Sequence, residues 1–325
     1  MTVLVTGAGG FLGGNVVREL VAQGRAVRTL DLEFPTPLLD EVEIVTGSIL
    51  DPDHLAATMG GVTHIVHAAA IAHLWTPGRF DYDRVNVVGT CRVLAEARRI
   101  GAKVVHVSSF TTLVGKDTPA DEMLDETVEI VPNHLLGPYP RSKRQAELAV
   151  LSAVGAGVDA CIVMPGAPVG AGDHRLTPPT AMLRDLAAGK IPALLNCSLN
   201  LVDARAVARA IVTALEAGEA GHRYLLTGED LPIDDFARMV AELSGVPAPR
   251  RHVPLWVATG AARAEALLSQ ITKRPPKAPL TGVRLAGRPA RFDNTKARES
   301  LRFSPRPVRD CLPEALDWLR AAGHL

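Results

Sequence analysis

Short apolar runs alternate with helix-like segments through the first half of the chain. The runs are typical of strands because they are rich in β-branched residues: TVLVT, AVRTLDL, EIVTG, HIVHAAA, KVVHVSS and ACIVMPG. Between them, apolar residues recur at helical spacing over about 13–23, 52–59 and 82–100, and again after Tyr139. Strands separated by helices indicate right-handed crossovers around a parallel sheet. The pattern therefore predicts an α/β fold with a doubly wound parallel sheet.

This alternation stops near Gly166. Prolines and glycines are frequent from 165 to 179, and mixed helices and short strands follow. We therefore expect one region over 1–165, with a return segment near 198–215, and a second, smaller mixed α/β region over 166–325. The run KRPPKAPLTG at 273–282 is predicted to be an exposed connector, since proline is not tolerated in a helix interior.

The composition is that of a folded protein with a small-molecule partner. Of the 325 residues, 47% are hydrophobic, enough for a packed core, and 35 basic residues balance 35 acidic ones. This balance, without a basic stripe, argues against binding to nucleic acid or to a membrane. The four cysteines lack the spacing of a zinc site, so no metal is expected. We find no signal sequence and no long apolar stretch, which favours a cytoplasmic location.

The link between the first predicted strand and helix is rich in glycine. LVTGAGGFLGG places Gly7, Gly10 and Gly13 in the pattern T-G-x-x-G-x-x-G. Glycine lets the backbone approach a pyrophosphate, and the helix amino terminus offers it free N–H donors. A lone glycine triplet is often only a tight turn, but Asp31 ends the second strand, where a carboxylate binds a ribose 2′-hydroxyl and repels a 2′-phosphate. The combination predicts a dinucleotide site that favours NAD over NADP, a preference weakened by two nearby arginines.

A phenol and an ammonium group share one face of the helix that begins near residue 138. Tyr139 and Lys143 are four residues apart, and by itself this spacing is more typical of a surface pair. Beside a nicotinamide the pair acquires a chemical role, because hydride transfer at an alcohol or carbonyl carbon requires a proton to move on the oxygen. An adjacent cation lowers the pKa of a phenol, so we expect Lys143 to make Tyr139 an acid/base. Ser109 or Thr111, after the strand KVVHV, would polarise the substrate oxygen, although such residues often only form turns.

The order of these motifs resembles that of the extended short-chain dehydrogenase/reductase family, which includes the NAD-dependent epimerases and dehydratases. The matching segments are TGAGGFLG, HAAA (67–70), NVVGT (86–90), VSS (107–109), YPRSK and PGAPVGAGD (165–173). The resemblance covers nearly the whole chain. It implies a Rossmann-type NAD-binding domain, a smaller mixed α/β substrate domain, and a catalytic set of Ser109, Tyr139 and Lys143. Many relatives are dimers through the helices near Asn86 and Tyr139, so a homodimer is expected.

The resemblance also implies which residues surround the cofactor and the substrate. Cofactor-binding positions are Gly7, Gly10, Phe11, Leu12, Asp31, Ser48, Ile49, Ala68, Ala69, Ala70, Asn86, Ser108, Tyr139, Lys143, Pro165 and Ala167. Positions facing the substrate are His73, Ser109, Thr111 and Pro168. Ser48 and Ile49 replace the acid of the family's G-D-L motif, so backbone or hydroxyl contacts would serve instead. The catalytic hydroxyl is assigned to Ser109, yet counting back from the next glycine places Phe110 in that slot, and Thr111 remains the alternative.

Departures from the family pattern narrow the reaction. Nucleotide-sugar 4,6-dehydratases carry Asp-Glu after the catalytic hydroxyl, whereas this chain has Phe110 and Thr111. Many sugar-nucleotide epimerases carry Arg-x-x-Asn where this chain has Met164 and Ala167, and an anionic diphosphate would find few cationic partners. The sequence is most similar to the dihydroflavonol-reductase and 3β-hydroxysteroid-dehydrogenase-like branch. This implies an NAD(H)-dependent oxidoreductase acting on a secondary alcohol or ketone of a mainly apolar molecule. The alternatives are a sugar or nucleotide-sugar epimerase and a non-catalytic dinucleotide-binding regulator.

Overall fold

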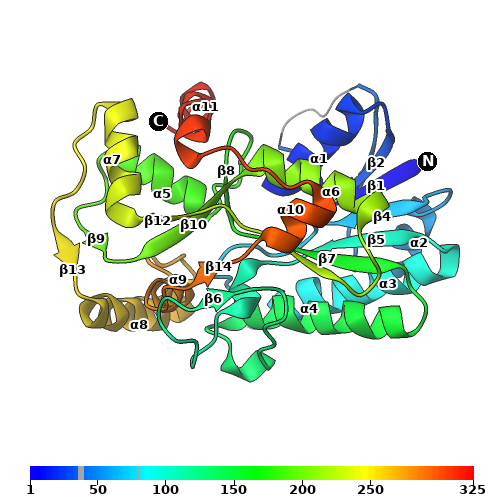
Figure 1. Cartoon of the computed structure of the whole chain (residues 1–325), viewed down its shortest axis with the longest axis horizontal. Helices are drawn as coiled ribbons and strands as arrows, with labels where there is room; N and C mark the ends of the chain where they lie inside the picture. Colours follow the sequence, from blue (N-terminus) through cyan, green and yellow to red (C-terminus); the bar gives the residue numbers. More distant parts are fainter. Residues whose placement is uncertain (36–39, 79–80) are drawn as a thin grey trace.

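The centre of the molecule is a parallel sheet (Figure 1). A computed structural model describes residues 1–35, 40–78 and 81–325. Within these residues seven parallel strands pair in the order β11-β7-β5-β4-β1-β2-β3, which runs outward in both directions from β1 and β4 and confirms the doubly wound fold. The strands are β1 (Thr2–Thr6), β2 (Ala26–Asp31), β3 (Val42–Thr46), β4 (His64–His67), β5 (Lys103–Val107), β7 (Ala160–Pro165) and β11 (Arg223–Leu226).

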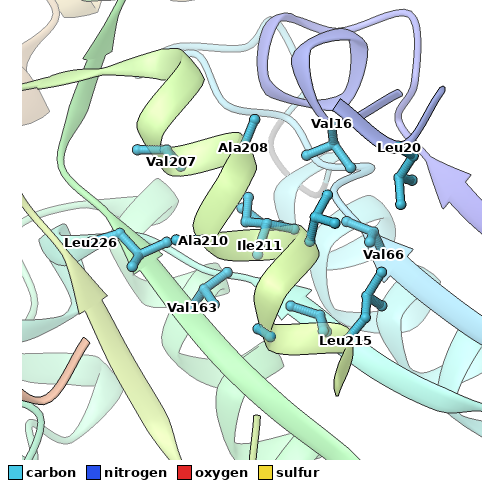
Figure 2. Close-up of a cluster of buried hydrophobic side chains, with 14 of the residues drawn as sticks. Val16, Leu20, Val66, Val163, Val207, Ala208, Ala210, Ile211, Leu215 and Leu226 are labelled. Carbon is cyan, nitrogen blue, oxygen red and sulfur yellow. The ribbon is translucent and has the colours of Figure 1, made fainter. Parts of the chain in front are cut away.

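Helices bury both faces of this sheet, which explains the nearly continuous apolar character of its strands. On one face α1 (Phe11–Ala22) and α6 (Ala204–Ala217) pack against valines of β1, β4, β5 and β7 (Figure 2). On the other face α2 (Pro52–Thr58), α3 (Gly89–Ile100) and α4 (Pro138–Gly155) cover the alternate residues of these strands. Successive side chains of a strand point to opposite faces, so a single strand supplies both cores.

The second region surrounds a small three-stranded sheet, β12-β10-β8. Three helices, α5, α7 and α11, form a separate apolar core with it, while α8 and α9 lie together at the edge of the molecule (Figure 1). No helix in the described part of the chain is long and apolar enough to cross a membrane. The elements are β6 (Met123–Leu124), β8 (Ala167–Val169), α5 (Pro178–Ala187), β9 (Leu194–Leu195), β10 (Ser198–Asp203), β12 (Glu229–Pro232), α7 (Ile233–Ser244), β13 (His252–Val253), α8 (Leu255–Thr272), α9 (Leu280–Ala286), β14 (Arg291–Phe292), α10 (Thr295–Leu301) and α11 (Val308–Ala321).

The division of the chain differs from the sequence prediction on its carboxyl-terminal side. Strand β11 lies beyond the expected return segment of 198–215, yet it pairs with β7 in the central sheet. Strand β10, which begins that segment, pairs with β8 and β12 instead, whereas α6 does return to pack on α1. The helix expected over 82–100 begins as a π-helical turn at Asp83–Val88. Short apolar strands carry no signal for the sheet they join, so periodicity alone could not assign them.

Candidate active site

The glycine-rich loop after β1 is folded tightly against the end of β4. Gly7 has a φ of +74°, and a Cβ there would lie 2.5 Å from the backbone nitrogen of Ala69. Gly13, in the first turn of α1, lies so close to the Gly7 carbonyl oxygen that a side chain would collide with it. The helix begins after Gly10 without a side-chain cap on its first N–H groups. Such a cradle of backbone donors fits the pyrophosphate of a dinucleotide.

Asp31 lies at the end of β2, beside this loop. Its Oδ2 accepts a hydrogen bond from Gly9 N at 2.9 Å, and its Oδ1 accepts one from Leu32 N at 2.7 Å. Arg175 places Nη2 3.4 Å from Asp31 Oδ1 and 3.6 Å from Glu33 Oε1. The carboxylate suits a ribose hydroxyl, and the guanidinium beside it weakens the repulsion of a phosphate. Sequence reasoning missed Arg175, whose one signal was its position two residues after the PGAPVGAGD motif.

Other predicted cofactor positions also contact neighbouring parts of the protein. The Ser48 hydroxyl accepts a hydrogen bond from Leu50 N at 3.1 Å, and Ile49 is buried in the core beneath α2 and α3. Residues 68–70 follow β4, and their backbone is the surface on which Gly7 packs. Their alanine side chains are small, so they leave space for a cofactor, but their contact with one stays a prediction. The Ser48 side chain forms a local turn.

Asn86, in the π-helical turn, joins the loop after β4 to α4. Its Oδ1 accepts a hydrogen bond from Ile71 N at 2.8 Å, and its Nδ2 donates to Ile71 O at 3.2 Å and to Ser142 Oγ at 2.9 Å. Ser142 Oγ in turn donates to Tyr139 O at 2.9 Å. Asn86 thus fixes the first turn of α4, and its contact with a cofactor stays a prediction.

Tyr139 and Lys143 are both buried on the first turns of α4, which excludes the surface pair considered from the sequence. Burial raises the pKa of the Tyr139 phenol, and a hydrogen bond with the Ser109 side chain acts in the opposite direction. Lys143 Nζ donates to Val107 O at 2.6 Å, and burial lowers the pKa of this ammonium group to about 8. The net direction is upward because the desolvation of Tyr139 prevails, and the expected influence of Lys143 on the phenol pKa stays a prediction.

Ser109 and Thr111, the two candidates for the catalytic hydroxyl, form a pair. Ser109 precedes the 3-10 turn Phe110–Leu113, and its Oγ accepts hydrogen bonds from Thr111 Oγ1 at 3.0 Å and from Thr111 N at 3.3 Å. Ser109 is the one of the two whose side chain acts on the pKa of the Tyr139 phenol. Since its oxygen already accepts from Thr111, its own proton is available to a substrate oxygen or to the phenol. Phe110, in the slot found by counting, packs edge-on against Phe292.

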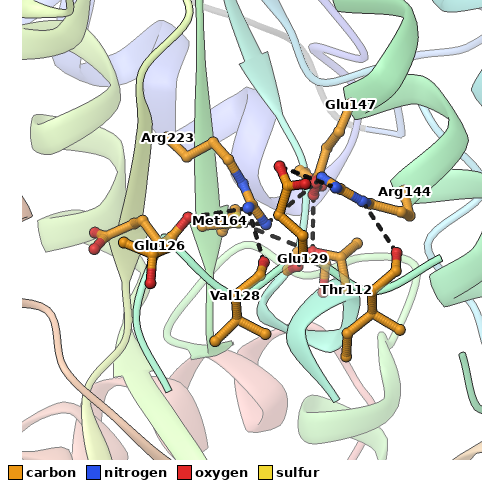
Figure 3. A network of polar contacts seen from close by, with 12 residues as sticks. Thr112, Glu126, Val128, Glu129, Arg144, Glu147, Met164 and Arg223 are labelled. Carbon is orange, nitrogen blue, oxygen red and sulfur yellow. Dashed lines mark hydrogen bonds and ion pairs between the residues drawn. The ribbon is translucent and has the colours of Figure 1, made fainter. Parts of the chain in front are cut away.

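Glu147 is the centre of a buried polar network behind this hydroxyl pair (Figure 3). Its Oε1 accepts hydrogen bonds from the Ser108 hydroxyl and, at 2.8 Å, from Thr112 Oγ1. Its Oε2 accepts from Arg144 Nη1 at 2.9 Å and lies 3.4 Å from Arg223 Nη2. Ser108, predicted to bind the cofactor, therefore directs its hydroxyl to Glu147. Because Ser108 and Thr112 flank the Ser109 turn, the carboxylate positions that turn.

A second polar chain crosses the sheet beside the site. Thr6 Oγ1 and Thr90 Oγ1 lie 2.8 and 3.0 Å from the two ring nitrogens of His67. The Thr90 hydroxyl donates to Asn86 O, so Nε2 of His67 donates to Thr90 and Nδ1 accepts from Thr6. Burial lowers the pKa of His67 to about 3. His106, whose ring centroid is 5.4 Å away, has no hydrogen-bond partner for either ring nitrogen among the described residues.

Besides Ser109 and Thr111, two residues are predicted to face the substrate, His73 and Pro168. His73, after β4, accepts a hydrogen bond through its carbonyl oxygen from the Tyr82 phenol at 2.6 Å. Burial lowers the pKa of the His73 imidazole, the charge of Asp173 opposes this, and that of Arg175 adds to it. The loop after β4 therefore lies close to the 165–173 motif. Pro168 lies in β8, and two positions predicted to bind the cofactor, Pro165 and Ala167, lie at the end of β7 and in β8.

The motifs and the fold agree with one known family. Residues 3–226 match the model of the NAD-dependent epimerase/dehydratase family. The chain belongs to this family. It is an enzyme of the extended short-chain dehydrogenase/reductase type, which confirms the predicted resemblance.

Several known proteins resemble the chain over most of its length. The sterol demethylase protein B of Methylococcus capsulatus is 32% identical and covers 100% of both chains. The 4-hydroxy-2-methyl-3-oxo-4-farnesyl-3,4-dihydroquinoline-1-oxide ketoreductase of Stigmatella aurantiaca is 30% identical over 99% of this chain and 97% of its own. The 3 beta-hydroxysteroid dehydrogenase/Delta 5→4-isomerase of Mycobacterium tuberculosis is 30% identical over 79% and 74%. The crystal structure of gox2253 is 32% identical, covers 100% of this chain and 99% of its own, and has a TM-score of 0.85.

Proposed function

We propose that the chain is an NAD(H)-dependent oxidoreductase that transfers hydride between the nicotinamide and a secondary alcohol or ketone of a mainly apolar small molecule. The observation that carries the proposal is the buried pair of Tyr139 and Ser109 beside the end of β5, at the edge of the sheet that also holds the glycine loop. Open α/β sheets bind their ligands at this edge. Asp31, with its hydrogen bond from Gly9 N, supports NAD as the cofactor over NADP.

The side chains divide the proton chemistry between them. A nicotinamide bound here would supply or accept the hydride. Tyr139 donates its phenolic proton to the carbonyl oxygen during reduction, and a pKa raised by burial keeps that proton in place until it is needed. Ser109 donates a second hydrogen bond to the same oxygen, since Thr111 occupies its acceptor side. Lys143, one helical turn from Tyr139 and held by Val107 O, keeps its positive charge below about pH 8 and would stabilise the developing phenolate.

Two observations support an apolar substrate. Met164, at the position where many sugar-nucleotide epimerases have an arginine, is fully buried and contacts Thr112 and Arg223 through its sulfur. Several relatives are named for a sterol, a farnesylated quinoline oxide or a steroid, and others are named for a dihydroflavonol or a 2-alkyl-3-oxoalkanoate. We therefore propose a skeleton of that apolar class over a nucleotide sugar.

The test is a titration with NADH and NADPH followed by turnover of ketones and secondary alcohols. We expect tighter binding of NADH, turnover by the natural chain, and a loss of about 10²–10⁴-fold in Tyr139→Phe with NADH binding retained. Tyr82→Phe is the control, because it removes a phenol whose ring lies 6.3 Å from that of Tyr139. Product formation without net change in NADH would identify an epimerase, and tight binding without turnover of any carbonyl would identify the regulator. Full activity of Tyr139→Phe would refute the mechanism.

A further inference from the structure

The charge of the chain is distributed unevenly, although its net value is zero. Between 250 and 291 there are nine Lys and Arg residues and one acidic residue, Glu265, so the rest of the chain has an equal excess of acids. All nine cations are exposed, and none forms an ion pair with any part of the chain that the structure describes. The expectation that the chain does not contact a membrane rested on its net charge. A net charge of zero does not reveal a locally positive segment.

Helix α8, within the same segment, presents an apolar face to solvent. Trp256, Gly260, Ala264, Leu267 and Ile271 recur at the spacing of one helix face, and all five are exposed. The side chains of Trp256, Leu267 and Ile271 are 77%, 65% and 82% exposed. Only small residues of α8, Ala262 and Ser269, are buried against the protein. A run of large exposed apolar side chains of this kind marks an interaction surface.

We propose that α8 and the basic residues around it dock the chain on the surface of an anionic lipid bilayer. The helix would lie in the interface, with Trp256, Leu267 and Ile271 among the acyl chains and the flanking Lys273, Arg274 and Lys277 against lipid phosphates. Arg263, which falls within the apolar face, has a long stem that reaches the headgroups. A second copy of the chain is the poorer occupant, because its α8 segment would bring the same positive charge.

The position of α8 gives this docking a consequence for the reaction, a step that rests on the proposed function. Helix α9 follows α8 and packs beside it. Thr281 of α9 lies against Gly137, so close that a Cβ on the glycine would collide with it. Gly137 is two residues before Tyr139, and Gly282 of α9 meets Leu74 in the loop that also carries His73. Docking therefore places the lipid surface beside the elements that frame the active site, where an apolar substrate could enter from the bilayer.

The experiment is sedimentation of the full chain with vesicles, without nicotinamide or substrate. We expect partitioning into vesicles of phosphatidylcholine with about 30% phosphatidylglycerol to exceed that into phosphatidylcholine alone by about tenfold, and to fall by about tenfold in high salt. The Leu267→Glu/Ile271→Glu and Lys273→Glu/Arg274→Glu variants should each lose most of the binding. Val131→Glu, which changes a side chain that is 61% exposed and lies outside segment 250–291, is the matched control.

Each result decides between docking on lipid and its competitors. Binding equal in all variants, or indifferent to lipid charge, would overturn the proposal. A dimer in solution that Leu267→Glu/Ile271→Glu converts to a monomer, with no vesicle binding, would assign the face to a second copy. Turnover of a water-soluble ketone by the same variants keeps the two proposals separate, since it depends on Tyr139 and not on α8.

Discussion

Arginine has opposite surroundings in two regions of this molecule. Around Glu147, Arg144 and Arg223 are buried, and both guanidinium groups contact the same carboxylate. In segment 250–291 nine cations are exposed, and no carboxylate in the described chain pairs with them. Apolar side chains show the same reversal, because they are enclosed on both faces of the sheet but turned outward on α8.

The difference follows from the cost of removing charge from water. A buried ion must be paired, so the pairing around Glu147 reports on the fold and on the turn that it holds. An exposed cation is under no such constraint, and an exposed leucine contributes nothing to the core. When exposed apolar side chains on one helix and exposed cations around it occur together, the fold does not explain them, and a partner outside the chain does.

The largest effect is expected from removing the carboxylate of Glu147 at the centre of the buried network. Glu147→Ala leaves two guanidinium groups buried without their carboxylate and should lower the free energy of unfolding by about 3–5 kcal/mol. Urea denaturation followed by circular dichroism measures this loss. The control is Glu129→Gln, because Glu129 pairs with the same Arg144 at 3.6 Å but is 72% exposed, and its removal should cost less than about 1 kcal/mol. Equal losses in the two variants would show that burial does not decide the strength of these pairs.

The candidate site and the Glu147 network beside it show which residues the sequence could predict and which it could not. The glycine loop, Asp31, Tyr139 and Lys143 could be singled out from the sequence because they stand in motifs with short, fixed spacings, and their roles stay predictions. Glu147 has the fitting i+4 spacing from Lys143, but its partners include Arg223, which is distant in the chain. Such partners are brought together only by the order of strands in the sheet.

The raised pKa of Tyr139 and the bond from Lys143 to Val107 O were equally out of reach. The pKa shift depends on burial, and the hydrogen bond depends on a backbone atom. Neither can be recognised from the pattern of residue types. Arg175 and the charge of segment 250–291 are visible in the sequence, but Arg175 lies beyond the motif that ends at Asp173, and the positive segment is hidden in a net charge of zero.

A buried histidine should make the fold sensitive to acid. His67 has a pKa lowered by burial to about 3, against about 6.5 in an unfolded chain, so the unfolded state binds more protons as pH falls below 6.5. The stabilisation present at neutral pH should therefore shrink by about 2 kcal/mol at pH 5. Unfolding of the natural chain at pH 7 and at pH 5 measures it. His67→Gln should reduce this acid dependence, while the same change at exposed His134 is the control. An unchanged slope in His67→Gln would contradict the assignment.

The activity should fall at alkaline pH because Lys143 loses its charge. Lys143 is buried in the candidate site, unlike the exposed lysines of segment 250–291. Burial lowers its pKa to about 8, so its positive charge is lost as pH rises through that value. The ratio kcat/KM should fall by about tenfold at pH 9, equivalent to about 1.4 kcal/mol of transition-state stabilisation. Lys143→Met should be poorly active at every pH, and its kcat/KM should not show this decrease above pH 8. A rate that is constant to pH 10 would show that the charge of Lys143 is not used.

The smallest effect on stability is expected from substitutions on the exposed apolar face of α8. Leu267→Glu/Ile271→Glu should change the free energy of unfolding by less than about 0.5 kcal/mol, because neither side chain is enclosed by the protein. Ala262→Glu on the same helix is the matched opposite, since Ala262 is buried and a carboxylate there would be desolvated without a partner. Urea denaturation of both variants separates the two faces of α8. A large loss of stability in the double variant would mean that the apolar face already packs within the folded chain. That face would then not be available to bind lipid.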